Sequence, residues 1–330
     1  MKNSESLKYD LVIIGGGPIG LNCAIEAKKA GLSYIVLEKG VLVNSLYNFP
    51  TNMTFFSTSN LLEIGGVPFI AHNDKPTRRE ALEYFRRVQE SWDLKVSLYT
   101  EVQSMTTSDE GYKIMTSKGT FYGSYVVVAT GFYDTPRLLN IPGEDLKKVK
   151  HFYDDPHPYV DQKVLVIGAA NSACDVALET FYKGAEVTMV IREPEIYPKV
   201  KYWIRPNIEN RIKEGSIKAY FNTTVKEIRQ SEVVLKTPEG EVTIENDFVL
   251  AMTGYMPNYA LFESLGLPIS KDADRVPIHN NETLETPLPG VYVAGVINSG
   301  LQTSKLFIEN TRIHSEIIVR SILSKVQAEA

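Results

Sequence analysis

The sequence predicts an α/β protein with two similar domains, each built on a parallel sheet that carries a glycine-rich loop. An apolar segment near the N-terminus, Leu11–Ile14, runs into three consecutive glycines, and a second one, Lys163–Ile167, runs into a looser copy of the loop. Two further segments, Tyr125–Gly131 and Phe248–Gly254, each end in Thr-Gly. Short continuous apolar runs are typical of parallel strands buried on both faces of a sheet. The length of 330 residues also favours two domains.

The first loop follows the pattern G-x-G-x-x-G. Gly15 permits the tight turn, Gly17 lets the backbone approach a pyrophosphate, and Gly20 lets the next helix pack against the strand. The amphipathic segment 21–30 is predicted to be that helix, and its N-terminal N–H groups suit a phosphate. The loop is completed by Pro18 and Ile19.

A second strand, Tyr34–Leu37, comes next and leads into Glu38. A carboxylate at this point is placed to accept hydrogen bonds from both hydroxyls of an adenosine ribose. Lys39 is compatible with a place beside the adenine or with a place at the surface. Strand, glycines, helix, strand and acid in this order predict a Rossmann-like dinucleotide-binding domain rather than a glycine turn with a structural role alone.

The second copy of the pattern lies after residue 160. The strand 163–167 leads into the loop Gly168-Ala-Ala-Asn-Ser-Ala173, in which Gly168, Asn171, Ser172 and Ala173 are predicted to bind the dinucleotide. A helix is predicted over 173–183 and a further strand over 185–191. The chain therefore holds two Rossmann-like dinucleotide-binding domains.

The second domain differs from the first in the residue that follows its second strand. Arg192 stands where the first domain has an acid, and a guanidinium can pair with a 2′-phosphate that a carboxylate would repel. Lys199 and Lys201 are close enough in sequence to assist. This pattern favours NADPH over NADH, although Glu193 next to Arg192 leaves open a solvated surface arginine.

Two dinucleotide folds in one chain suggest FAD in the first domain and NADPH in the second. Each Thr-Gly segment is typical of a crossover between such domains, with Thr130 and Gly131 on the FAD side and Gly254 on the return. Late in the chain, the strand ending at Gly295 and a helix predicted from 303 to 322 would bring Val296 and Ser304 to the flavin. These features predict an FAD-binding domain at 1–132 and 254–330, with an NADPH-binding domain inserted at 133–253.

Composition excludes several other classes of protein. Hydrophobic residues make up 43% and charged residues 23% of the chain, which is ordinary for a globular protein, and the net charge of −5 argues against a nucleic-acid partner. The two cysteines, Cys23 and Cys174, have neither disulfide-scaffold nor metal-ligand spacing, and no metal is expected. We find no signal peptide and no apolar run long enough for a membrane span, so we expect a cytoplasmic protein.

The whole layout resembles the low-molecular-weight thioredoxin reductases. Asn48, in Asn-Phe-Pro, resembles the N-W-P asparagine that approaches FAD in those enzymes. Their hallmark is a C-x-x-C motif just after the second glycine loop, but the segment Asn171-Ser-Ala-Cys174 holds a single cysteine. One thiol cannot form the intramolecular disulfide that accepts electrons from the flavin, so reduction of thioredoxin by that route is excluded.

The block 38–69, with Asn48-Phe-Pro and Leu62-Glu-Ile-Gly-Gly-Val-Pro-Phe69, resembles the YpdA-type family. His157-Pro-Tyr, Ala294-Gly-Val296 and Phe307-Ile-Glu-Asn310 agree with it, and the resemblance runs almost end to end. It implies an NADPH-dependent FAD enzyme, typically a homodimer, that reduces bacillithiol disulfide or a bacilliredoxin.

The chain departs from that family in its first glycine loop. Many members carry a cysteine where this sequence has Ile19, which forms neither a mixed disulfide nor a thiolate–flavin pair. Cys23 lies one helical turn further on, and we expect both Cys23 and Cys174 to be buried in helices. Catalysis is therefore expected to centre on the flavin, with no catalytic side chain assigned and with direct transfer to the substrate as the remaining route.

Two alternative functions stay open on the sequence alone. One is a ferredoxin/flavodoxin–NADP reductase, which also lacks C-x-x-C and for which Lys147, Lys148 and Lys150 are a thin candidate docking surface. The other is a non-catalytic flavin redox sensor, against which an intact NADPH site argues.

Overall fold

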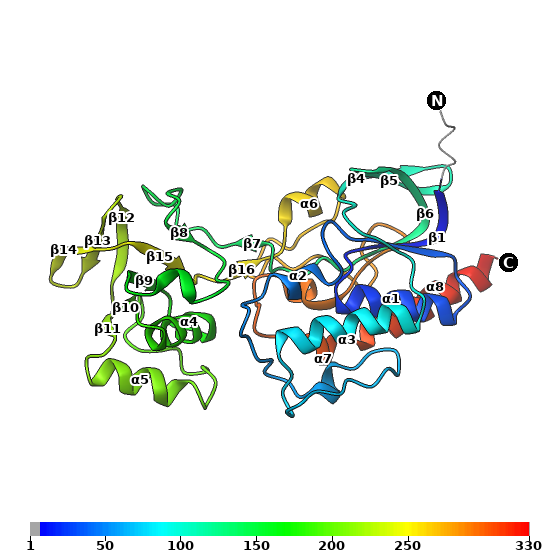
Figure 1. Ribbon diagram of the computed structural model, residues 1–330. Coiled ribbons are helices and arrows are strands. Elements are labelled where there is room, and N and C mark those ends of the chain that lie inside the picture. The colour runs from blue at the N-terminus through cyan, green and yellow to red at the C-terminus, as the bar shows by residue number, and fades with distance from the viewer. Residues whose placement is uncertain (1–6, 330) are drawn as a thin grey trace. The chain divides into compact units, whose positions relative to one another are not determined.

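The computed structural model describes residues 7–329, and the chain divides into two compact units (Figure 1). The first unit consists of Met1–Thr135 and Tyr255–Ala330, and the second of Pro136–Gly254. The chain leaves the first unit at the short strand β7 (Thr135–Pro136) and returns at β16 (Tyr255–Met256).

The first unit is built on a seven-stranded sheet whose long strand β6 (Gly119–Val128) has partners of both kinds. Its first half pairs antiparallel with β5 (Gly111–Thr116), which pairs with β4 (Val102–Ser108). Its second half lies between two parallel neighbours, β1 (Leu7–Ile14) and β17 (Val291–Val293). Beyond β1 the parallel order continues through β2 (Tyr34–Leu37) and β3 (Val96–Ser97).

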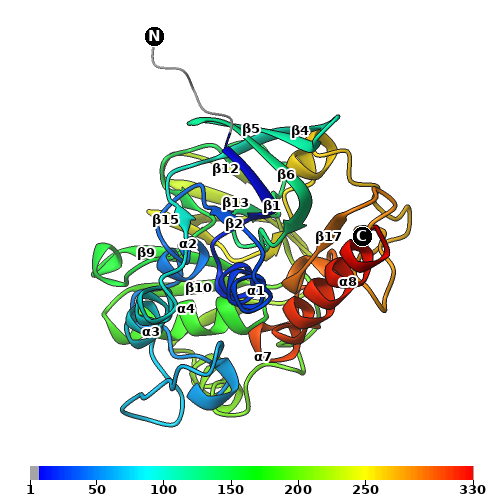
Figure 2. The same ribbon diagram turned by 90° about the vertical axis from the view of Figure 1, so that its right-hand side faces the viewer.

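The sheet of the first unit is buried on both faces, as the continuous apolar runs predict. Leu11 and Ile13 of β1 belong to one apolar cluster, whereas Val12 and Ile14 belong to another, because successive side chains of a strand point to opposite faces. On one side, α1 (Pro18–Lys29) packs along the C-terminal helix α8 (Ile313–Glu329), as Figure 2 shows.

Several shorter elements complete the first unit. Helix α3 (Arg78–Ser91) begins with a capping box between Thr77 and Glu80 and buries Tyr84, Phe85 and Val88 along one face. The others are α2 (Asn44–Tyr47), η1 (Ser59–Leu62), α6 (Tyr259–Ser264), η3 (Gly295–Ser299) and α7 (Ile308–Thr311).

The second unit repeats the architecture in a smaller form. Five parallel strands form its sheet, in the order β11 (Lys218–Tyr220), β10 (Glu186–Val190), β9 (Lys163–Ile167), β15 (Phe248–Ala251) and β8 (Val149–Lys150). An antiparallel meander adds β12 (Thr224–Ile228), β13 (Glu232–Thr237) and β14 (Gly240–Glu245). The helices are α4 (Asn171–Tyr182), α5 (Arg205–Lys213) and the short η2 (His157–Tyr159).

The prediction of one helix from 303 to 322 is wrong. Residues 301–305 form turns, with Lys305 N donating to Gln302 O, and helix formation begins only at Ile308. Asn310 fixes that start, because its side-chain oxygen accepts a 2.7 Å hydrogen bond from Phe307 N and its amide group donates to Lys305 O. Ser304 consequently lies exposed in a turn, four residues before α7.

Candidate functional site

Three parallel strands of the first unit end at the same level. Ile14 of β1 and Val293 of β17 are both in register with Val128 of β6. The next residues stay together, since Ala129 N donates to Ile14 O at 2.8 Å and Ala294 N donates to Val128 O at 2.9 Å. The first glycine loop, Thr130 and Gly295 therefore meet at the carboxyl edge of one sheet, where ligands of open α/β sheets bind.

Each of the three glycines of the first loop is suited to its position for a different reason. Gly15 has φ of +108°, and a Cβ there would lie 2.5 Å from Ala129 O. A Cβ at Gly20 would lie 1.9 Å from Gly15 O, so only glycine lets helix α1 pack this close to the strand. A Cβ at Gly17 would meet no atom of residues 7–329 within 4 Å. The protein itself leaves the space over Gly17 open, which fits a backbone that a pyrophosphate approaches.

Helix α1 begins at this loop with its first N–H groups uncapped by any side chain. Gly17 is the N-cap, Pro18 begins the helix, and no acidic residue lies in the first turn. Free N–H groups and the positive end of the helix dipole are the features that bind phosphate.

Glu38 is 6% exposed and its two oxygens hold the backbone around it. Oε2 accepts a 2.7 Å hydrogen bond from Gly16 N, and Oε1 accepts one of 2.9 Å from Gly40 N. Burial raises the pKa of this carboxyl group above its ordinary value, and the two N–H donors oppose that rise. Lys39 pairs with Asp134 at 2.8 Å, so its ammonium group has a protein partner.

Thr130 supplies an unpaired polar atom at the same edge. Its hydroxyl oxygen is buried and has no hydrogen-bond partner in the described part of the chain. Gly131 follows with φ of +68°, and the nearest atom to a Cβ there would be Ser45 Oγ at 3.9 Å. An orphaned hydroxyl beside open backbone fits a ligand that carries polar groups.

Ile19, in the first turn of α1, lies against the loop that follows β17. It is 7% exposed, and a Cβ at Gly295 would lie 3.3 Å from Ile19 Cγ1. The isoleucine side chain therefore packs against the glycine that follows β17. Val296, the next residue, is half-buried in η3.

Two of the residues predicted to bind FAD lie exposed, outside the contacts that the described residues make at this edge. Asn48 is the exposed C-cap of α2, and its amide group donates to Asn44 O at 2.9 Å. Ser304 lies in the turn described above. Sequence reasoning also missed His314, whose Nδ1 accepts a 3.1 Å hydrogen bond from Gly295 N, because no motif links a helix residue to a loop 19 positions earlier.

The second glycine loop has the same construction in its own unit. Gly168 has φ of +129°, and a Cβ there would lie 2.7 Å from Met252 O and 3.1 Å from the methyl group of Ala173. Helix α4 begins after Ala170 without a side-chain cap or a first-turn acid. Asn171 Oδ1 accepts a 2.9 Å hydrogen bond from Lys201 N. Ser172 is exposed in the first turn, and Gly254, with φ of +89°, follows β15.

The basic residues near this loop differ in how accessible their charged groups are to an anion. The Arg192 side chain is 80% exposed and pairs with its neighbour Glu193 at 2.9 Å. Lys199 is also exposed. Lys201 is 16% exposed and pairs with Asp175 at 3.0 Å, so its role is to tie the 199–201 segment to α4. Arg192 is therefore the group best placed to receive a further anion.

Both cysteines are buried, which confirms that part of the sequence prediction. Cys23 and Cys174 each have no exposed surface, and neither forms a disulfide. Burial raises the pKa of both thiols to about 12, so almost no thiolate exists at neutral pH. Because the thiolate is the nucleophile in disulfide exchange, neither cysteine is suited to react with a substrate disulfide.

We predict that iodoacetamide at neutral pH leaves both cysteines of the native protein unmodified, since burial denies the reagent both access and thiolate. The same treatment in guanidinium should add two adducts per chain by mass spectrometry. A Ser324→Cys variant, whose new thiol would sit on an exposed position of α8, serves as the positive control. Rapid labelling of Cys23 in the native protein would contradict the inert-thiol interpretation.

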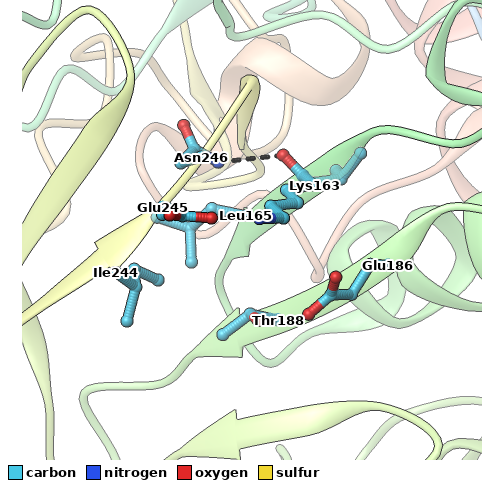
Figure 3. Close-up of a pocket in the computed structure, with 8 residues that line it drawn as sticks. Lys163, Leu165, Glu186, Thr188, Ile244, Glu245 and Asn246 are labelled. Atoms are coloured by element: carbon cyan, nitrogen blue, oxygen red, sulfur yellow. Dashed lines mark hydrogen bonds and ion pairs between the residues drawn. The ribbon is translucent and has the colours of Figure 1, made fainter.

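A hollow in the second unit lies away from its glycine loop. Its lining comes from β9, β10, the end of β14 and Asn246, and Asn246 Nδ2 donates to Lys163 O at 3.2 Å (Figure 3). Lys163 and Glu186 are the first residues of parallel strands, so the hollow is at the amino edge of the sheet. Nucleotides bind at the opposite, carboxyl edge.

The candidate docking lysines are not all at the surface. Lys148 is 8% exposed, and its ammonium group donates to Asn246 O at 3.0 Å.

No helix of the described residues is long and apolar enough to cross a membrane. Within residues 7–329 no group of three or more His, Cys, Asp and Glu side chains is arranged to hold a metal ion.

Comparison with known proteins agrees with this geometry. Residues 12–295 match the family described as pyridine nucleotide-disulphide oxidoreductase. The chain belongs to this family. It is therefore an enzyme of the flavin- and pyridine-nucleotide-dependent oxidoreductases, with the two-domain α/β fold that the sequence predicts.

Similar proteins extend the likeness over nearly the whole chain. The chain is 45% identical to bacilliredoxin reductase Bdr of Bacillus subtilis over 95% of this chain and 97% of that protein. The structure of bacillithiol disulfide reductase Bdr (YpdA) from Staphylococcus aureus matches with a TM-score of 0.94 and 41% identity, covering 97% of this chain and 99% of that one. A ferredoxin–NADP reductase of Ignicoccus hospitalis is 25% identical, with 87% of this chain and 90% of that protein covered. The expected membership of the YpdA-type reductases is thus confirmed.

Proposed function

We propose that this chain is an NADPH-dependent FAD enzyme that reduces bacillithiol disulfide or the mixed disulfide of a bacilliredoxin. The observation that carries the proposal is the end-to-end likeness to proteins named for these two activities. The buried state of both cysteines supports a version of the reaction in which no thiol of this chain exchanges with the substrate. We further propose that the enzyme is a cytoplasmic homodimer.

We assign FAD to the first unit, within the proposed segments 1–132 and 254–330. Gly17 and the start of α1 would hold the pyrophosphate, and Glu38 would accept from the ribose with the lone pairs that Gly16 N and Gly40 N leave free. The Thr130 hydroxyl group is available to a polar atom of the flavin half. The full proposed set is Gly15, Gly17, Pro18, Ile19, Gly20, Glu38, Lys39, Asn48, Thr130, Gly131, Gly295, Val296 and Ser304.

We assign NADPH to the second unit, within the proposed segment 133–253 and its end at Gly254. The uncapped start of α4 would take the pyrophosphate, and Arg192 would exchange its contact with Glu193 for the 2′-phosphate, which carries more negative charge. The proposed set is Gly168, Asn171, Ser172, Ala173, Arg192 and Gly254.

The protein's part in the reaction is to bind and orient the cofactors and the substrate disulfide. A bound flavin supplies the two-electron chemistry between nicotinamide and disulfide. Ile19 places a branched aliphatic group at the loop, where it contributes packing and no redox chemistry. With Cys23 and Cys174 inert, the substrate disulfide must be reduced without a protein thiol as carrier.

The two alternative functions have less support. A ferredoxin–NADP reductase needs an electropositive docking surface, but Lys148 is buried and the identity to the named relative is 25%. A non-catalytic sensor does not agree with membership of an enzyme family.

Steady-state NADPH oxidation with a panel of acceptors tests the proposal. We expect turnover with bacillithiol disulfide, or with bacilliredoxin charged with bacillithiol, and little with ferredoxin, flavodoxin or glutathione disulfide. Free-thiol release, measured in parallel, should equal two thiols per NADPH for the symmetrical disulfide, because each disulfide takes up two electrons. Turnover with ferredoxin alone would replace the proposal by its first alternative.

A further inference from the structure

His314 is the second residue of α8, and its side chain reaches back to the loop after β17. Its Nδ1 accepts the N–H of Gly295 at 3.1 Å, across 19 residues of chain. His314 joins the C-terminal helix to the carboxyl edge of the sheet, where Thr130 and the first glycine loop also lie.

The peptide that His314 holds is conformationally unusual. Gly295 has φ of +86°, a region that residues with a Cβ rarely adopt. A side chain at this position would also press against Ile19, because a Cβ would lie 3.3 Å from Ile19 Cγ1. The Gly295 N–H donates to a single side chain, the imidazole of His314. The next peptide is held separately, because the Ser299 hydroxyl group donates to Val296 O at 2.9 Å.

The imidazole is held in the state that can accept this bond. Burial, together with the nearby His279, lowers the pKa of His314 to about 4, so the ring is neutral at physiological pH. Acceptance at Nδ1 places the ring proton on Nε2. His279 is itself fixed, with Nδ1 at 2.6 Å from Pro277 O and Nε2 at 3.5 Å from Asn298 Nδ2.

Asn298 connects this second histidine to the same turn. Its Nδ2 donates to Val293 O, the last residue of β17, at 3.1 Å, and its Oδ1 is buried without a partner in the described residues. The turn at Gly295–Val296 is therefore clamped from two sides, by His314 on its N–H and by Asn298 on the strand end before it.

We propose that His314 is a positioning residue for the FAD site: by accepting the Gly295 N–H it fixes the turn Gly295–Val296 that faces the flavin half of the cofactor. This inference rests on the proposed function, since it requires FAD at the carboxyl edge of the first unit. A residue in this role acts on affinity and on the environment of the flavin, and it touches no reacting atom.

The test compares three substitutions at one position. In His314→Asn the amide oxygen lies near the place of Nδ1 and can still accept, whereas His314→Gln reaches instead toward the place of Nε2 and His314→Leu has no acceptor. The full-length apoprotein of each variant is titrated with FAD by fluorescence quenching. We expect FAD affinity to fall about tenfold in His314→Leu and His314→Gln, as for one misoriented hydrogen bond, and to stay within about threefold in His314→Asn.

Two further readouts separate positioning from general structural loss. The melting temperature of the apoprotein reports folding, and the visible absorption and circular dichroism of bound FAD report the flavin environment, which should change in His314→Leu and be restored in His314→Asn. His72→Leu, which alters an exposed histidine of the same unit, is the matched control and should match wild type. Wild-type FAD affinity and spectra in all three variants would overturn the proposal. A loss of FAD affinity that is as large in His314→Asn as in His314→Leu would overturn it as well. Failure of the wild-type protein to bind FAD would instead overturn the proposed function.

Discussion

Replacing Gly17 by alanine is expected to weaken FAD binding about a hundredfold while leaving the apoprotein folded. The new Cβ meets no protein atom within 4 Å, and Gly17 already has φ of −75°, which alanine adopts without strain. The methyl group would occupy the space through which the pyrophosphate approaches the backbone. Fluorescence titration measures the affinity. We expect the apoprotein to lose less than about 1 kcal/mol of unfolding free energy, the usual N-cap difference between glycine and alanine.

Gly20→Ala is the matched comparison, because its Cβ would meet the protein itself. A Cβ 1.9 Å from Gly15 O forces helix α1 away from the strand, so both folding and FAD binding should suffer. The unfolding free energy of the apoprotein should fall by about 3 kcal/mol. If Gly17→Ala destabilised the apoprotein as much as Gly20→Ala, the space over Gly17 would not be a ligand site, and the assignment of FAD to this loop would lose its main support.

Replacing Arg192 by alanine is expected to raise KM for NADPH about thirtyfold and to change KM for NADH less than about twofold. The Arg192 side chain is 80% exposed and, within the part of the chain that the structure describes, pairs with Glu193, so it is available to a 2′-phosphate. Charge-assisted hydrogen bonds to such a group contribute about 2 kcal/mol, which corresponds to a change of this size. Steady-state kinetics with both nucleotides give the ratio of the variant's KM to the wild-type KM for each.

Lys201→Ala separates a phosphate contact from support of the loop. Lys201 is engaged with Asp175, so its loss should affect NADPH and NADH to a similar and smaller extent. An equal rise in KM for both nucleotides in Arg192→Ala would show that Arg192 supports the fold of the site and does not select NADPH.

The elements that local patterns specify were predictable. Strands β2 and β9 agree residue for residue with the expected Tyr34–Leu37 and Lys163–Ile167, because apolar runs bounded by glycine and charged residues set both ends. Helices α1 and α4 begin three and two residues earlier than expected, at Pro18 and Asn171, since the glycine loops pass directly into helix. The chain crosses between its two units at Thr135 and Gly254, next to the two Thr-Gly segments.

Features that depend on the contacts of one particular side chain were not predictable. The expected helix from 303 failed because Asn310, seven residues later, determines where helix formation begins. His314 escaped notice because its partner lies on another element. From the sequence, Lys201 is close enough to assist Arg192, but its ammonium group pairs with Asp175, one turn into α4. For His314 and Lys201 the partner lies on another element, and such a contact leaves no periodic pattern in the sequence.

A variant without thiols tests whether this chain reduces its disulfide substrate with no cysteine of its own. The Cys23→Ala/Cys174→Ala protein is reduced anaerobically with NADPH, and its reoxidation is followed in the flavin absorption band after mixing with bacillithiol disulfide, charged bacilliredoxin, ferredoxin or flavodoxin. We predict that bacillithiol disulfide or charged bacilliredoxin reoxidises the variant at the wild-type rate, and that ferredoxin and flavodoxin do not. Loss of that reoxidation in a variant that still binds FAD and accepts electrons from NADPH would show that a cysteine of this chain takes part in the reaction. Reoxidation by ferredoxin or flavodoxin alone would show that the electron acceptor is not a disulfide.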